Sequence, residues 1–144
     1  VSSRRIELKI PVKTEFKLVL NEIDKDDISI KDNKVTFRKP LTVNVDSQIE
    51  GDVEIVNSSN GLLDKAADML TSGKSAQEFL NEKAQDTVYD TSEYIMEDKD
   101  TIKKVVKSAQ KSLEEILNIS SSSNISVELT EDDLTFVNVD KKAK

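Results

Sequence analysis

The sequence contains neither cysteine nor histidine in 144 residues. Structural zinc, iron–sulfur clusters, thiol nucleophiles and histidine-based triads are therefore excluded. Acid–base chemistry would fall to Asp, Glu, Lys or Tyr, and an oxygen-ligand site for Ca²⁺ or Mg²⁺ is the metal chemistry that remains open. We predict no cofactor and no enzymatic activity. A hydrolase that uses paired carboxylates stays open as the enzymatic alternative, because no pair stands out among 28 acidic residues.

Aromatic residues and glycine are also scarce. Four Phe, two Tyr and no Trp leave the core to Ile, Leu and Val. The three glycines are not clustered, so the chain has no Gly-rich phosphate loop. No apolar run approaches the roughly 18 residues that are needed to span a bilayer. The chain starts at Val1 rather than Met, so we expect the natural N-terminus, with any signal or anchor that it carries, to lie upstream.

The charge balance excludes a further class of partner. With 28 acidic against 21 basic residues, the net charge is −7. Nucleic-acid binding needs a basic surface that replaces counterions, so we predict no nucleic-acid partner. The same balance opposes docking of the whole domain on anionic lipid, which leaves the anchor as the one expected membrane contact.

Residues 1–58 have the pattern of β-strands. Apolar residues alternate with polar ones at Ile6, Leu8, Ile10 and Val12, and Pro11 marks an edge or the end of that strand. Asp32 and Asn33 tolerate positive φ between two alternating segments, which predicts a tight hairpin. Apolar residues then hold odd positions from Leu41 to Ile55, interrupted at Ser47 and Gly51, so we predict two strands joined near residues 48–51.

Residues 60–118 change to helical spacing. The pattern predicts a short helix over residues 62–70, a second over residues 76–95 with a capping box at Ser75, and a third from Thr101 with Asp100 as its cap. The third helix carries the most regular apolar stripe, formed by Ile102, Val105, Val106, Ala109, Leu113, Ile116 and Leu117.

Two short strands close the chain between residues 124 and 140, and we predict that they form a hairpin. Strands, then helices, then strands, without regular βαβ alternation, indicate an α+β fold. We predict a single domain over residues 1–144, with a β-rich part at 1–58, a helical part at 60–118 and C-terminal strands at 124–140.

Acidic residues gather before the first hairpin, at Asp24, Asp26, Asp27 and Asp32. Such a cluster could hold Ca²⁺ with backbone carbonyls, but its spacing does not fit an EF-hand loop. A solvated loop that leads into the hairpin is the simpler interpretation.

Four lysines share one face of the third helix: Lys103, Lys104, Lys107 and Lys111. They stand toward the N-terminal half of the helix, where the macrodipole favours acids instead. This arrangement predicts that the four lysines bind a partner. The candidate partners are an anionic surface, a polyanion and an acidic patch on another protein. The alternative is an ordinary solvated helix face.

The order of elements resembles a bacterial family of unknown function, domain-of-unknown-function family 4230. The resemblance is carried by Asn21–Ile30, the Asp32-Asn33 turn, Lys34–Pro40, the helix over Thr101–Leu117 with Ala109, and Ile125–Leu129. It implies a bacterial protein tethered by an N-terminal transmembrane segment, with this domain outside the cytoplasm, and it implies no catalytic residues. A fainter likeness in element order is to band-7 type domains, whose helices mediate oligomerisation.

These observations favour a non-enzymatic domain, the extracytoplasmic part of a membrane-tethered protein, that acts through self-association or a protein or envelope partner. Without a preceding anchor the domain would be cytoplasmic. A small-ligand or lipid carrier is the main alternative, and an apolar cavity of several hundred Å³ would favour it. Converging carboxyl groups of raised pKa would favour the hydrolase.

Overall fold

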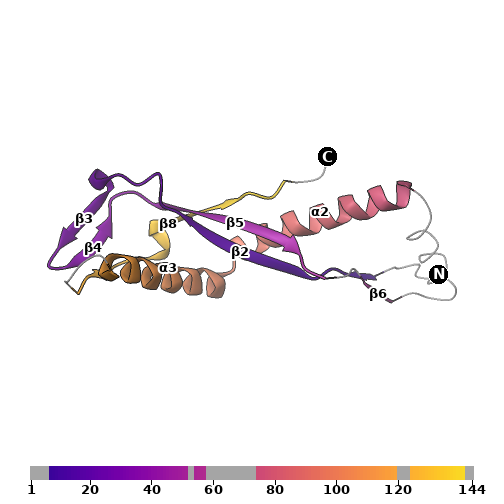
Figure 1. Cartoon of the computed structure of the whole chain (residues 1–144). Helices are drawn as coiled ribbons and strands as arrows, with labels where there is room; N and C mark the ends of the chain where they lie inside the picture. The colour runs from indigo at the N-terminus through magenta and orange to yellow at the C-terminus, as the bar shows by residue number, and fades with distance from the viewer. Residues whose placement is uncertain (1–6, 52–53, 58–73, 120–123, 142–144) are drawn as a thin grey trace. The chain divides into compact units, whose positions relative to one another are not determined.

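The computed structural model of the chain describes residues 7–51, 54–57, 74–119 and 124–141 (Figure 1). The strands are β1 (Glu7–Lys9), β2 (Val12–Val19), β3 (Ile28–Lys31), β4 (Lys34–Phe37), β5 (Leu41–Ile49), β6 (Glu54–Asn57), β7 (Ser126–Val127) and β8 (Leu134–Asn138). The helices are α2 (Lys74–Met96) and α3 (Lys99–Ile119), with 3₁₀ turns η1 (Lys25–Asp27) and η2 (Glu131–Asp133). The predicted α+β class is confirmed. The helix predicted over residues 62–70 and the side chain of Ser75 lie outside what is described.

The chain divides into two compact units. The first takes residues 1–14, 47–91 and 140–144, and the second takes residues 15–46 and 92–139. These units interleave along the chain, whereas the parts predicted within one domain, 1–58, 60–118 and 124–140, are consecutive. The units interleave because strands that are distant in sequence pair with one another.

In the first unit, β1 and β6 pair antiparallel, with Lys9 opposite Glu54. β1 ends before Pro11, as predicted, because proline has no N–H to donate to a strand partner. The turn after β5 closes onto this proline: the backbone N of Glu50 donates to Pro11 O at 2.9 Å. Gly51 follows with φ +112°, and a Cβ there would lie 3.2 Å from Pro11 Cγ. Glycine therefore suits this turn, which lies where the sequence predicted the strand break.

Ser47 stays inside β5 rather than interrupting it. The residue is buried, and its Oγ lies 2.8 Å from Oγ1 of Thr14 on β2. Its backbone N donates to the carboxylate of Asp140, at 3.0 Å to Oδ2. These partners explain why a polar residue is tolerated there. Thr14 faces Ser47 and Pro11 faces Glu50, so residue numbers rise along β2 as they fall along β5, and the two strands run antiparallel.

In the second unit, β3 and β4 form the predicted hairpin. Ile28 pairs with Phe37, and Lys31 pairs with Lys34 across the turn. The two turn residues have positive φ, 53° at Asp32 and 61° at Asn33. This is the geometry that a two-residue turn needs to match the twist of its strands.

The two C-terminal strands lie in different sheets. β7 adds to β4 in parallel, with Val127 beside Val35, and β8 adds to β5 in parallel, with Leu134 beside Leu41. The sequence predicted that these strands would pair as a hairpin with each other, but each instead completes a three-stranded sheet, in the orders β3-β4-β7 and β2-β5-β8. Parallel addition buries Val127 and Leu134 in the shared core.

Helix α3 packs on the core of the second unit. The buried residues of that cluster are Val35, Leu41, Val43, Leu113, Val127, Leu129 and Leu134. From the predicted stripe, Val105, Val106, Ala109 and Leu117 pack against it, as expected for one face of a helix. Ile116 differs, because 54% of its surface is exposed at the edge of the stripe.

Asp98, rather than the predicted Asp100, caps α3. Its Oδ2 accepts the backbone N–H of Thr101 at 3.1 Å and the Thr101 hydroxyl at 2.6 Å. An N-cap side chain reaches the amide three residues on, and Thr101 stands at that distance from Asp98. Asp100 lies within the first turn of the helix, where its charge still matches the macrodipole.

Candidate functional site

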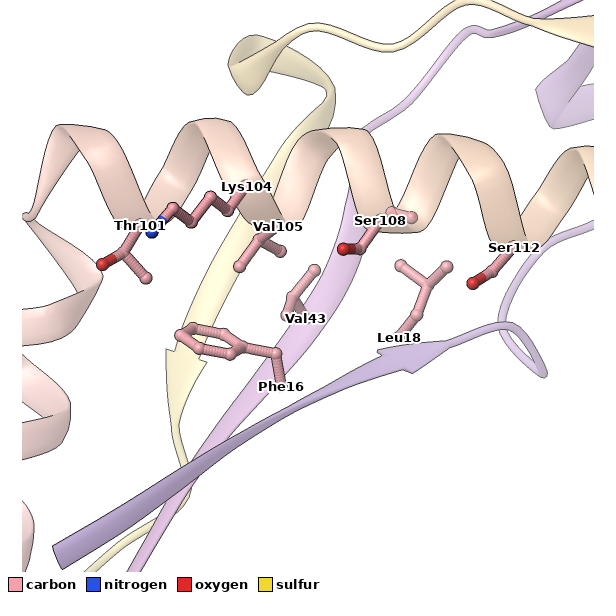
Figure 2. Close-up of a pocket in the computed structure, with 9 residues that line it drawn as sticks. Phe16, Leu18, Val43, Thr101, Lys104, Val105, Ser108 and Ser112 are labelled. Carbon is pink, nitrogen blue, oxygen red and sulfur yellow. The ribbon is translucent and has the colours of Figure 1, made fainter.

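A groove lies between one flank of α3 and the strands β2 and β5, within the second unit (Figure 2). Its volume is about 450 Å³, inside the range of about 300–1,000 Å³ typical of small-molecule sites. Phe16 and Leu18 from β2 and Val43 from β5 form one wall, and Val105 and Ala109 of α3 face them. These side chains present only carbon atoms to the groove.

The alternation of side chains along a β-strand explains why these residues form the first wall of the groove. Phe16 and Leu18 are separated by two positions on β2, so both point to the same face of the sheet as buried Val43. The ring of Phe16 also meets Phe136 of β8 edge to face, with centroids 6.2 Å apart. This contact fixes the ring at one end of the groove.

The polar lining comes from the helix. Thr101, Ser108 and Ser112 carry hydroxyls along one flank of α3, and Lys104 adds an ammonium group. Figure 2 shows Ser108 and Ser112 projecting on the side that faces Leu18. Because these side chains are short, the flank does not fill the space above the sheet. A groove results where bulkier residues would have packed.

Lys104 forms the charged end of the groove, and Asp98, which does not line it, hydrogen-bonds to the lining residue Thr101. The Lys104 side chain extends along α3 toward Thr101 (Figure 2). Hydrogen bonds from the hydroxyl and the backbone N–H of Thr101 hold the pKa of Asp98 below its usual value, against an opposing effect of desolvation, and the charge of Lys104 makes the smallest contribution to the lowering. The Asp98 carboxylate thus interacts electrostatically with the ammonium group of Lys104.

The structure separates the four predicted lysines. All four are exposed, but Lys104 alone lines the groove among the residues that the structure describes. At about 100° per residue, Lys111 lies within about 20° of Lys104 around the helix, Lys107 about 60° away and Lys103 about 100° away. The four lysines therefore occupy one broad exposed face of α3, with Lys104 at its groove edge, and the role of that face in partner binding stays a prediction.

The acidic cluster near the first hairpin is used locally. The Asp27 carboxylate accepts the backbone N–H of Asp24 at 2.9 Å and pairs with Lys39 Nζ at 3.2 Å. The Asp24 hydrogen bond, followed by the Lys39 contacts, lowers the pKa of Asp27 despite some desolvation. Asp32 lies in the hairpin turn, at the far end of β3. Across the described segments, no three acidic side chains gather where they could share a metal ion.

The groove was not singled out from the sequence. Phe16, Leu18 and Val43 fall within residues 1–58, for which the sequence predicts strands and no binding site. The available signal was the hydroxyl series at Thr101, Ser108 and Ser112, whose spacings of seven and four place the three side chains on one helix flank. Nothing in the sequence indicates which element that flank faces.

The fold and the groove define an α+β protein with a groove beside a helix. No protein-family model matches the chain, and no curated protein or solved structure matches it significantly. The resemblance to family 4230 therefore stays a prediction. Neither α2 nor α3, the helices in the part of the chain that is described, has the length and apolarity needed to cross a bilayer.

Proposed function

We propose that the chain is a non-enzymatic binding module whose ligand enters the groove beside α3 with its apolar part against the sheet. The observation that carries this proposal is the combination of volume and lining: about 450 Å³, carbon walls, and a few polar groups on one side. This combination is typical of sites for small apolar molecules.

The groove also argues for binding over hydrolysis. None of its lining residues is a carboxylate. The two described carboxyl groups with shifted pKa, Asp27 and Asp98, are both lowered, whereas a general acid needs a raised pKa. A ligand that is held and released, without reaction, fits this lining best.

A neutral fluorescent probe tests the proposal. N-phenyl-1-naphthylamine carries no charge, and its emission rises when it enters an apolar site. We expect saturable binding to the wild-type protein and a loss of about tenfold in affinity for Ser108→Leu, because a leucine at this position fills the groove. Gln110→Leu adds the same side chain about 160° away around α3 and should leave binding unchanged.

Two results of the probe experiment would show that the groove is not the binding site. If the probe does not bind, or if Gln110→Leu weakens it as much as Ser108→Leu does, the groove is not the site. Circular dichroism and urea unfolding of both variants show whether the fold is intact.

Contact with a protein partner is the second candidate. Ile116 and Ile119, near the C-terminal end of α3, are 54% and 85% exposed, and exposed apolar groups of this kind often mark interaction surfaces. If this surface mediates self-association, Ile116→Ser with Ile119→Ser converts an oligomer to a monomer in light scattering. A wild-type protein that is monomeric at all concentrations would contradict self-association.

The tethered, extracytoplasmic placement that the resemblance implies is part of the same proposal. The natural protein's N-terminal segment tests it. An apolar run of about 20 residues ahead of Val1 would support the tether, and its absence would favour the cytoplasm.

A further inference from the structure

The charged end of the groove makes the ligand class more specific. Among the described residues that line the groove, Lys104 carries the one ionised group, and that group is a cation. The chain as a whole carries a net charge of −7, so a free anion is repelled at long range by most of the surface. A cation at the mouth of an apolar groove is then the feature that selects a ligand by charge.

The neighbouring lysines reinforce this local field. Lys103, Lys107 and Lys111 stand on the same helix and are exposed. They raise the positive potential around α3, but they do not line the groove, so their effect is on attraction rather than on contact. Lys104 contributes to the positive potential around α3 and also lines the groove.

The walls define the other part of the ligand. Phe16, Val43 and Leu18 run from the charged end along the sheet face, and Ser108 and Ser112 follow on the helix side (Figure 2). At roughly 30 Å³ for a group of the size of water, a volume of 450 Å³ holds about fifteen such groups. A single linear chain of about a dozen carbons with a small head matches this shape.

We propose that the groove binds a single-chain amphiphile with an anionic head, of the class of long-chain carboxylates, with the head at Lys104 and the chain against Phe16, Val43 and Leu18. This inference rests on the proposed binding function. The carboxylate of Asp98, which hydrogen-bonds to the lining residue Thr101 and whose pKa the charge of Lys104 lowers, competes with the ligand head for that ammonium group.

Displacement of the neutral probe by three matched amphiphiles tests the head group. The competitors are dodecanoate, dodecyltrimethylammonium and dodecyl maltoside, each below its micelle concentration. We expect dodecanoate to displace the probe about tenfold more effectively than the cation, because a charge-assisted contact forms with the anion alone. Equal displacement by the anion and the cation, with the probe still bound at the groove, overturns this inference and leaves the binding function standing.

Two pairs of variants locate the contact. Lys104→Gln should remove most of the preference for dodecanoate, whereas Lys103→Gln, its neighbour on the lysine face, removes the same charge and should retain most of it. Asp98→Asn should strengthen dodecanoate binding severalfold, since it removes the competing charge while asparagine caps a helix as well as aspartate does. Binding of the neutral probe should be unchanged in Lys103→Gln, which lies outside the groove, and circular dichroism of all three variants shows whether the fold is intact.

A membrane surface is the competing occupant, and vesicles separate it from a free amphiphile. The test is sedimentation of the protein with vesicles that contain anionic phosphatidylglycerol. Two results together would overturn the inference: Lys103→Gln, Lys104→Gln and Lys107→Gln weaken vesicle binding equally, and the protein shows no preference for dodecanoate over the cation. That result would assign the whole lysine face to a bilayer. A dodecanoate preference that depends on Lys104 alone supports the groove.

Discussion

The side chain of Asn118 and the backbone of Ile125 exchange two hydrogen bonds. Nδ2 of Asn118 donates to the Ile125 carbonyl at 2.9 Å, and the Ile125 backbone N donates to Asn118 Oδ1 at 2.7 Å. An asparagine in the last turn of α3 thus satisfies the backbone just ahead of β7, and holds the helix against the sheet that β7 completes.

Asn118→Ala removes both hydrogen bonds and leaves a partly buried N–H and C=O without this partner. We expect a loss of about 1–3 kcal/mol in the free energy of unfolding, measured by urea denaturation. Asn124→Ala is the matched control, because Asn124 is exposed one residue before Ile125, and it should change stability by less than about 0.5 kcal/mol. Equal effects of the two variants would show that the paired hydrogen bonds add nothing.

The cap of α3 predicts a pH-dependent effect. Asp98→Ala should lower the urea midpoint at neutral pH more than Asp100→Ala does, because Asp98 accepts both hydrogen bonds from Thr101. The pKa of Asp98 in the folded protein lies below its usual 3.8. Its contribution is therefore complete above that value and is lost as the pH falls through the lowered pKa.

The measurement is the difference in urea midpoint between the wild type and each variant across that range. For Asp98→Ala the difference should shrink as the solution becomes more acidic than pH 3.8. A difference that stays constant into the acid range would mean that the charged form of Asp98 is not what stabilises the helix.

The local features of the fold could be predicted from the sequence. The Asp32-Asn33 turn was predictable because few residue pairs tolerate positive φ at both positions. The stripe on α3 was predictable because helical spacing alone decides which side chains share a face. The sequence pointed to Asp100 as the cap because three acids, Glu97, Asp98 and Asp100, stand around the start of α3, and only the contacts with Thr101 identify Asp98.

Strand partners and the groove could not be predicted in the same way. Alternation shows which side of β7 and β8 is buried, but it does not say which strand lies beside Val127 or Leu134. Their neighbours, Val35 and Leu41, are more than ninety positions away in sequence. The groove depends on this arrangement, since Ser108 leaves space only because a sheet face lies opposite.

Gly51 provides a test of backbone strain. Gly51→Ala places a Cβ 3.2 Å from Pro11 Cγ in a residue whose φ is +112°. We expect a loss of about 1–3 kcal/mol in stability by thermal or urea unfolding, because a non-glycine residue is strained at that φ. Glu50→Ala, the exposed neighbour, should be nearly neutral, and equal losses for the two variants would contradict a role for φ.

The hydrogen bond between Asp140 and the backbone of Ser47 should contribute measurably to stability. Asp140→Ala takes the carboxylate away from the backbone N of buried Ser47, to which its two oxygens now lie at 3.0 and 3.3 Å. We expect the free energy of unfolding to fall by about 1–3 kcal/mol, the usual result of leaving a buried donor without its acceptor. Asp140→Asn keeps one acceptor oxygen and should lose less than half as much. If both variants lost the same amount, the charge of Asp140 rather than its hydrogen bond to Ser47 would be what stabilises this end of the strand.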